Sequence, residues 1–319
     1  MRLKIMRKQI ALSCLLVLAS LFFAPNAFAQ EKVEKKIFPL ERNGVRLHLA
    51  RYQTVQVQEE RAPLLMVHGL TFSSHEFDVN YKDYSLVRFF AKKGFSVWLL
   101  DVAGYGESQP VEDGFMPDSD YAAEDINAAV DLIIKESGAE KIDVLGWSWG
   151  TVTSGRFAAK YGDEKIRRLV FFAPIVAGLG AAEVKEPFNH GAWKHAADDF
   201  QRNEDGSINY EITELGVVET YSFNCWFYDK EHGPNGGRRD LLVDPKVRLI
   251  PTASINVPTL VIVGDNDSYV STVLCEEAAE SLPNKDSKMI VLEGGSHYMM
   301  MEAPYYKEFR ETVLDFLRD

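Results

Sequence analysis

Short apolar runs alternate with helix-forming stretches along most of this chain. The apolar runs lack polar alternation, which is typical of strands buried on both faces of a sheet. They lie at 64–67, 95–100, 142–145, 169–173, 259–263 and 289–292. The stretches predicted as helices lie at 84–93, 121–136, 151–161, 272–282 and 305–317. Strands that alternate with helices in this way predict an α/β fold, with a mostly parallel, doubly wound sheet covered on both faces.

A hairpin is predicted ahead of the parallel part. Residues 37–40 and 45–52 flank the pair Asn43-Gly44. Asn-Gly is the strongest two-residue signal for a hairpin turn, because both positions tolerate a positive φ. The sheet is therefore expected to begin with two antiparallel strands.

The alternation stops between residues 173 and 258, where the sequence becomes aromatic and polar. A structureless loop of this length is improbable in a compact domain. We therefore expect a core formed by residues 30–175 and 257–319, with a mainly helical cap inserted at 176–256. Most aromatic residues of this segment are expected to hold the cap together, and a few to line a pocket.

The first 29 residues differ in composition from the rest. Four basic residues precede an apolar run at 10–24, and Ala27 and Ala29 place small residues where a signal peptidase reads them. The run of 15 residues is shorter than the roughly 20 needed to cross a bilayer. We expect cleavage after Ala29 and export to the periplasm or the medium, with no stable membrane span afterwards.

The net charge of the chain disfavours some classes of partner. The chain has 35 basic and 47 acidic residues, and removal of the leader leaves 31 basic residues and a formal charge of about −16. Such a charge repels nucleic acid and anionic membranes.

The mature chain keeps Cys225 and Cys275. They could pair or remain thiols, and the sequence leaves this open, as it does the oligomeric state.

The segment Gly146-Trp147-Ser148-Trp149-Gly150 lies between a predicted strand and a predicted helix. A serine hydroxyl is a poor nucleophile unless it projects from a tight turn toward a base. The two glycines permit such a turn, since they lack a Cβ atom. Ser148 is therefore the candidate nucleophile.

A base and an orienting acid are expected at the same edge of the sheet. His297 follows the last predicted strand, and Asp267 follows the strand at 259–263. We prefer Asp267 to Asp265 because it lies further into the turn, whereas Asp265 is expected to cap that turn. Asp143 begins its strand and so lies at the wrong end of the sheet. Four other histidines are read as structural: His48, His190, His195 and His232.

Acyl transfer also needs two donors for the oxyanion of its transition state. The backbone N–H of Trp149, directly after the nucleophile, is one candidate. The other is the N–H of Leu70, in the segment His68-Gly69-Leu70-Thr71 after the first parallel strand. His68 is expected to brace this loop.

From Val45 to the C-terminus, these motifs in this order resemble the α/β-hydrolase family. Asp101 to Ser108 is similar to the family's Asp-x-x-Gly-x-Gly-x-Ser loop, although Val102-Ala103 replaces a more usual polar or basic pair. The resemblance implies the α/β-hydrolase fold. With Ser148 rather than an aspartate as nucleophile, it implies acyl chemistry and excludes the family's dehalogenases and epoxide hydrolases.

We therefore expect a serine hydrolase that cleaves a small-molecule carboxylic ester through an acyl-enzyme on Ser148, without a cofactor or metal. A proline-iminopeptidase-like aminopeptidase is the alternative. The Gly-x-Ser-Trp-Gly pattern is similar to that group, and cap acids could hold a substrate amine. These acids are Glu183, Glu186, Asp198 and Asp199. An acyltransferase also stays open, and a non-catalytic binding protein is disfavoured because no expected part of the site is missing.

Overall fold

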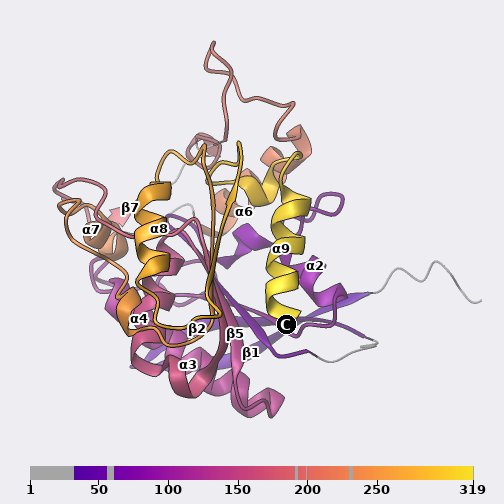
Figure 1. Ribbon diagram of the computed structural model, residues 1–319, viewed down its shortest axis with the longest axis vertical. Coiled ribbons are helices and arrows are strands. Elements are labelled where there is room, and N and C mark those ends of the chain that lie inside the picture. Colours follow the sequence, from indigo (N-terminus) through magenta and orange to yellow (C-terminus); the bar gives the residue numbers. More distant parts are fainter. Residues whose placement is uncertain (1–31, 56–60, 191–192, 199, 230–232, 319) are drawn as a thin grey trace, which may run out of the picture. The chain divides into compact units, whose positions relative to one another are not determined.

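The computed structural model describes residues 32–55, 61–190, 193–198, 200–229 and 233–318, and those of them from Val33 onward form one compact unit (Figure 1). The predicted signal peptide, residues 1–29, lies outside the described residues and stays a prediction. Sequencing the N-terminus of the exported protein would test it, since cleavage after Ala29 leaves Gln30 first.

The fold centres on an eight-stranded sheet of order β1-β2-β4-β3-β5-β6-β9-β10. β1, β2 and β4 pair antiparallel, and every pair from β4 to β10 is parallel. The strands are β1 Val33–Arg42, β2 Val45–Thr54, β3 Leu64–Val67, β4 Val97–Asp101, β5 Ile142–Trp147, β6 Ile166–Phe172, β9 Thr259–Gly264 and β10 Lys288–Leu292. The predicted fold class is therefore confirmed.

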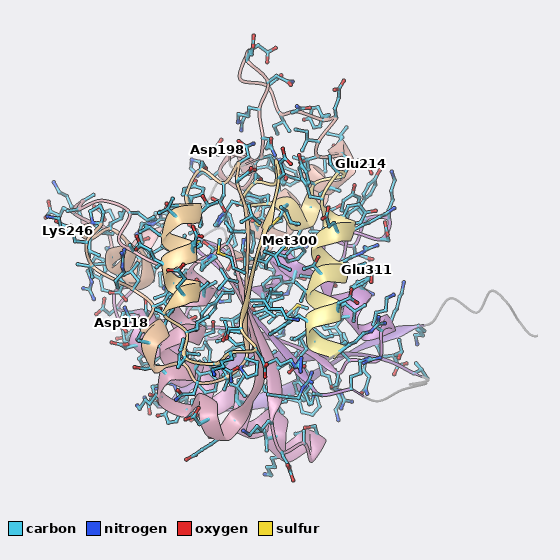
Figure 2. All side chains as sticks on the ribbon, viewed as in Figure 1. Asp118, Asp198, Glu214, Lys246, Met300 and Glu311 are labelled. Carbon is cyan, nitrogen blue, oxygen red and sulfur yellow. The ribbon has the colours of Figure 1, made fainter. Side chains whose placement is uncertain are left out.

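Helices cover the sheet. They are α2 Leu86–Lys92, α3 Ser119–Ser137, α4 Trp149–Lys165, α8 Thr272–Glu280 and α9 Tyr306–Arg318, with the short 3-10 turns η1 Ser74–Phe77 and η3 Met299–Met301. In Figure 1 the orange to yellow strands β9 and β10 run between α8 and α9. Glu311 of α9 and Met300 of η3, both labelled in Figure 2, differ in burial: Glu311 is exposed, whereas Met300 is buried.

The register of the parallel strands brings their carboxyl ends level. Trp147 pairs with Phe172, which pairs with Ile262, which in turn pairs with Ile290. The residues that follow β5, β9 and β10 therefore leave the sheet at the same edge, which is where ligands bind in parallel α/β sheets. This edge holds all three candidate catalytic side chains.

The segment 176–256 contains α5 Trp193–Ala196, α6 Leu215–Asp229 and α7 Gly236–Leu241, the turn η2 Thr252–Ser254 and a two-stranded sheet of β7 Phe188–Asn189 and β8 Gly233–Pro234. Tyr221 of α6 is fully buried, and its ring packs edge-on against Tyr298 from the histidine loop. The boundaries of a separate cap remain a prediction.

Cys225 and Cys275 are both buried, unpaired thiols. No helix of the described residues has the length and apolar character that crossing a membrane requires.

Candidate active site

Ser148 occupies a sharp turn between β5 and α4. Its φ of 55° and ψ of −122° lie in a region that side-chain-bearing residues rarely adopt, and its N–H donates to the carbonyl oxygen of Phe172 at 3.0 Å. A Cβ atom at Gly146 would clash with the carbonyl of Gly150, and one at Gly150 with the carbonyl of Val67. The two glycines of the motif are therefore needed for close approach of backbone to backbone.

His297 and Asp267 are in direct contact. His297 Nδ1 and Asp267 Oδ2 lie 2.7 Å apart, and both side chains are almost fully buried. The other carboxylate oxygen of Asp267 accepts the N–H groups of Tyr269 and Val270 at 2.8 and 3.1 Å. The carboxylate is thus fixed by its own turn on one side, and it orients the imidazole on the other.

The loop that carries His297 is itself held in place. The Trp147 indole Nε1 donates to the carbonyl oxygen of His297 at 3.1 Å, and Ser296 Oγ donates to Glu302 Oε1 at 2.6 Å. Burial raises the pKa of Glu302. Because Trp147 directly precedes Ser148, the same residue links the nucleophile turn to the histidine loop.

Asp265 has a different role from the one expected. Its Oδ1 accepts the N–H of Gly294 at 2.6 Å, so it bonds the histidine loop rather than capping its own turn. Capping of that turn is instead performed by Asp267, through Tyr269 and Val270. The expectation for Asp265 was therefore wrong. The two loops approach so closely that a Cβ atom at Gly264 would clash with the backbone of Gly295.

The loop after β3 lies against the nucleophile. A Cβ atom built on Gly69 would come within 3.0 Å of Ser148 Cβ and 3.6 Å of Ser148 Oγ. Leu70 lines the same pocket as Ser148. Trp149 is the first residue of α4, where backbone N–H groups have no acceptor within the helix. Both predicted oxyanion donors thus lie beside Ser148, and their role stays a prediction.

Two buried side chains brace this loop. As expected, His68 is structural: its Nε2 accepts the N–H of Val102 at 3.2 Å. Glu76 Oε1 accepts the N–H of Gly69 at 2.8 Å, and the side chain is buried. Desolvation holds the pKa of Glu76 well above its ordinary value. No sequence signal pointed to Glu76, since a single acid in a loop is normally solvated.

A second carboxylate reaches the loop from helix α6. Asp229, the last residue of α6, accepts from the N–H and Oγ of Ser73 at 2.9 and 2.8 Å and from the N–H of Gly106 at 2.8 Å. Burial raises the pKa of Asp229 to about 7, and the nearby charge of Asp101 adds to the shift. Helix α6 is therefore fastened both to the loop after β3 and to the loop from Asp101 to Ser108.

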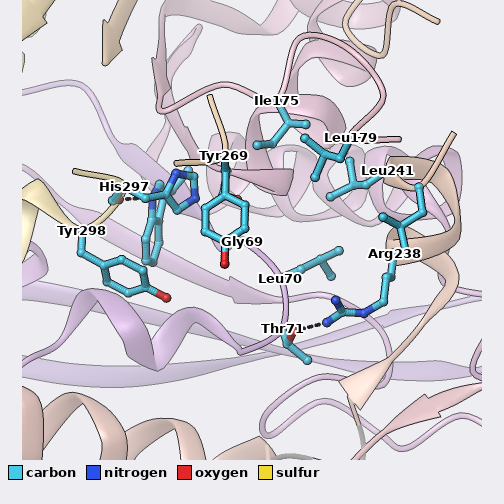
Figure 3. Close-up of a pocket in the computed structure, with 13 residues that line it drawn as sticks. Gly69, Leu70, Thr71, Ile175, Leu179, Arg238, Leu241, Tyr269, His297 and Tyr298 are labelled. Carbon is cyan, nitrogen blue, oxygen red and sulfur yellow. Dashed lines mark hydrogen bonds between the residues drawn. The ribbon is translucent and has the colours of Figure 1, made fainter. Parts of the chain in front are cut away.

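Ser148 and His297 line one cavity of about 140 Å³. Its other lining residues are mostly apolar or aromatic, with one charged side chain: Gly69, Leu70, Thr71, Trp147, Ile175, Leu179, Arg238, Leu241, Leu242, Tyr269 and Tyr298. Figure 3 shows His297 and Tyr298 at one end, Arg238 and Thr71 at the other, and Tyr269 between them. Sequence reasoning left these cavity-lining positions unassigned.

A group of side chains elsewhere has atoms close enough to hold a metal ion. Among the described residues it comprises His48, His75 and Glu107, which do not line the cavity. These groups already pair with one another: His75 Nε2 and Glu107 Oε2 lie 3.1 Å apart, and Lys35 Nζ is 3.5 Å from the same oxygen. His190 and His195 are both exposed and do not belong to this group.

Comparison with known proteins gives a consistent picture. Residues 62–200 match the family model described as the alpha/beta hydrolase fold. The chain is 26% identical over 299 residues to a proline iminopeptidase of Thermoplasma volcanium, covering 83% of this chain and 92% of the relative. It is 23% identical over 268 residues to an uncharacterized carboxylesterase, nap, of Bacillus subtilis, covering 81% and 80% of the two chains. The crystal structure of naproxen esterase from Bacillus subtilis superposes with a TM-score of 0.58 at 20% identity, covering 89% of this chain and 92% of the esterase.

Proposed function

Because this chain is an α/β-hydrolase-fold protein, we propose that it is a serine hydrolase that cleaves a carboxylic ester of a small molecule. The observation that carries the proposal is the 2.7 Å contact between His297 Nδ1 and Asp267 Oδ2 beside a cavity that Ser148 also lines. A histidine oriented by a buried carboxylate is the base that a serine nucleophile requires.

In the first half of the proposed reaction, Ser148 Oγ attacks the ester carbonyl carbon while His297 Nε2 takes the hydroxyl proton. The carbonyl oxygen becomes an oxyanion, and the N–H groups of Leu70 and Trp149 stabilise it. The bond to the leaving alkoxide then breaks, and His297 returns the proton to it. The products at this stage are a free alcohol and an acyl-enzyme on Ser148.

In the second half, water takes the place of the alcohol. His297 accepts a proton from the water as its oxygen attacks the acyl carbon, and the same oxyanion donors act again. The bond from the acyl carbon to Ser148 Oγ breaks, and His297 returns the proton to the serine. Asp267 stays ionised throughout and stabilises the imidazolium that forms twice.

The cavity supports a modest acyl group. Its volume of about 140 Å³ is close to that of cavities that accept a benzene-sized ligand. The side chains of Ile175, Leu179 and Leu241 make part of its wall apolar. An ester with a short acyl chain fits this space better than a long-chain lipid.

The similarity to a proline iminopeptidase makes an aminopeptidase the second candidate. That reaction needs an acidic group to hold the substrate amine. Among the lining residues that the structure describes there is no Asp or Glu, and Arg238 would repel an ammonium group. Of the four cap acids considered above, Glu183, Glu186 and Asp198 are exposed, and Asp199 lies outside the described residues. The charge of the cavity therefore favours an ester.

The test is hydrolysis of short-chain aryl esters by residues 30–319. Ser148→Ala should lower kcat by about a million-fold, and a fluorophosphonate should label the wild-type protein at Ser148 and not this variant. His190→Ala, which changes an exposed histidine, is the matched control for His297→Ala and should retain full activity. Activity that survives Ser148→Ala refutes the nucleophile, and faster cleavage of proline anilide than of esters favours the aminopeptidase.

A further inference from the structure

Arg238 reaches from the cap into the cavity. Its Nη2 donates to Thr71 Oγ1 at 2.5 Å, and its Nε donates to Asn235 Oδ1 at 3.1 Å. Both acceptors are neutral, so they fix the position of the guanidinium group without balancing its charge. Figure 3 shows the side chain extended toward Thr71, at the opposite end of the cavity from His297.

The charge of Arg238 has no carboxylate partner within the part of the chain that the structure describes. Its contacts there are the two hydrogen bonds above, which use two of its five N–H groups. A guanidinium group stays charged at any physiological pH, and a partly buried charge without a counter-ion is costly. In a chain with a formal charge of −12, such an arginine in a ligand cavity points to an anion as the missing partner.

The position of Arg238 relative to the nucleophile limits the size of that anion. Thr71 lies two residues after Gly69, which corresponds to at most about 7 Å of chain, and Gly69 is in contact with Ser148. An acid group bound by Arg238 and an ester carbonyl at Ser148 Oγ are therefore separated by only a few bonds. This spacing, like the cavity volume, fits a short molecule.

We propose that Arg238 and Thr71 form a carboxylate subsite, so that the preferred substrate is a short ester that also bears a free carboxylate, such as the half-ester of a small dicarboxylic acid. The two N–H edges of a guanidinium group match the two oxygens of a carboxylate. The hydroxyl of Thr71, which accepts from Arg238, can donate its own proton to the same anion. The choice of substrate rests on the hydrolase function proposed above, whereas binding of the anion does not.

The kinetic test compares monomethyl succinate with methyl 4-methylpentanoate, in which an isopropyl group replaces the carboxylate. Wild-type protein should prefer the acid. Arg238→Gln should lower the acid-to-neutral ratio of kcat/KM by about 100-fold, mainly through a higher KM for the acid, because a charge-assisted pair is lost. Arg238→Lys keeps the charge but loses the paired N–H donors of the guanidinium group, so it should give an intermediate ratio.

Arg239 provides the matched control. It is the next residue of α7, is exposed, and lies over the ring of Phe115 rather than in the cavity. Arg239→Gln should leave the ratio unchanged. If Arg238→Gln lowers kcat/KM equally for both esters, Arg238 only braces the cap, and the subsite is refuted.

Calorimetric titration with succinate separates the subsite from the hydrolase function. Succinate should bind the wild-type protein and Arg239→Gln, and should not bind Arg238→Gln. Binding of succinate by a protein that cleaves neither ester would support the subsite and contradict the hydrolase. Cleavage of both esters at equal rates, without succinate binding, would overturn the subsite and leave the hydrolase standing.

Discussion

Replacement of Asp267 by asparagine is the sharpest test of the proposed triad. One oxygen of Asp267 accepts two backbone N–H groups, those of Tyr269 and Val270, and the other accepts from His297 Nδ1. In Asp267→Asn the amide oxygen must take the first position, since an NH2 group there would face two donors. The NH2 group then faces His297 Nδ1, which becomes an acceptor.

This orientation reverses the tautomer of the base. With Nδ1 as acceptor, the proton of the neutral imidazole resides on Nε2, which can no longer take the proton of Ser148. The same substitution lowers kcat about 10⁴-fold in a serine protease with this arrangement. We expect a loss of similar size here, which corresponds to about 5 kcal/mol of transition-state stabilisation.

The assay is the steady-state hydrolysis of a short aryl ester, with thermal unfolding as a check on the fold. Asp265→Asn is the matched control, because Asp265 bonds the N–H of Gly294 rather than the imidazole. It should keep activity within about three-fold, since its amide oxygen can still accept that bond. A folded Asp267→Asn protein with more than a tenth of wild-type kcat would show that Asp267 does not orient the base.

Two further predictions concern stability. The ordinary pKa of aspartate is 3.8, whereas that of folded Asp229 is raised to about 7, so the folded state holds this proton over a range where the unfolded state has lost it. The free energy of unfolding should therefore fall by at most about 4 kcal/mol as the pH rises from about 4 to about 7. Measured by urea unfolding, the free energy of unfolding of Asp229→Asn should depend less on pH than that of the wild-type protein. An equal dependence on pH in the two proteins would contradict this. Gly150→Ala should lower the free energy of unfolding by about 3 kcal/mol or more, because its Cβ overlaps the carbonyl of Val67, whereas Gly162→Ala in the same helix meets neighbours at 3.5 Å or more and should be neutral or stabilising in the same measurement.

The buried strands could be predicted because a strand buried on both faces is a short continuous run of apolar residues. The run at 64–67 coincides with β3, and the run at 259–263 falls short of β9 by one residue. The edge strand β1 is longer than the predicted 37–40, spanning Val33–Arg42. Most of its side chains are exposed, so hydrogen bonds to β2 rather than apolar residues extend it.

The candidate catalytic residues could be located for a similar reason. Ser148, Asp267 and His297 each follow a recognisable strand, and parallel strands bring their ends together. Arg238 could not be found in this way. It lies in a segment without periodicity, and its significance comes from a contact with Thr71 that is 167 positions away in the sequence. A prediction from local sequence patterns finds residues that directly follow the strands of the sheet. It misses residues such as Arg238, which lies in a segment without such a pattern.

The loop after β3 explains why the cap should affect rate as well as binding. It is held at three points along five residues: Gly69 by Glu76, Thr71 by Arg238, and Ser73 by Asp229. Two of these three partners come from the cap, yet the loop also carries the proposed oxyanion donor of Leu70. Loss of the Asp229 contact should therefore move the proposed oxyanion donor and lower kcat for acidic and neutral esters alike. Loss of the Arg238 contact should act mainly on KM for the acid, because Glu76 and Asp229 still hold the loop on either side of Thr71.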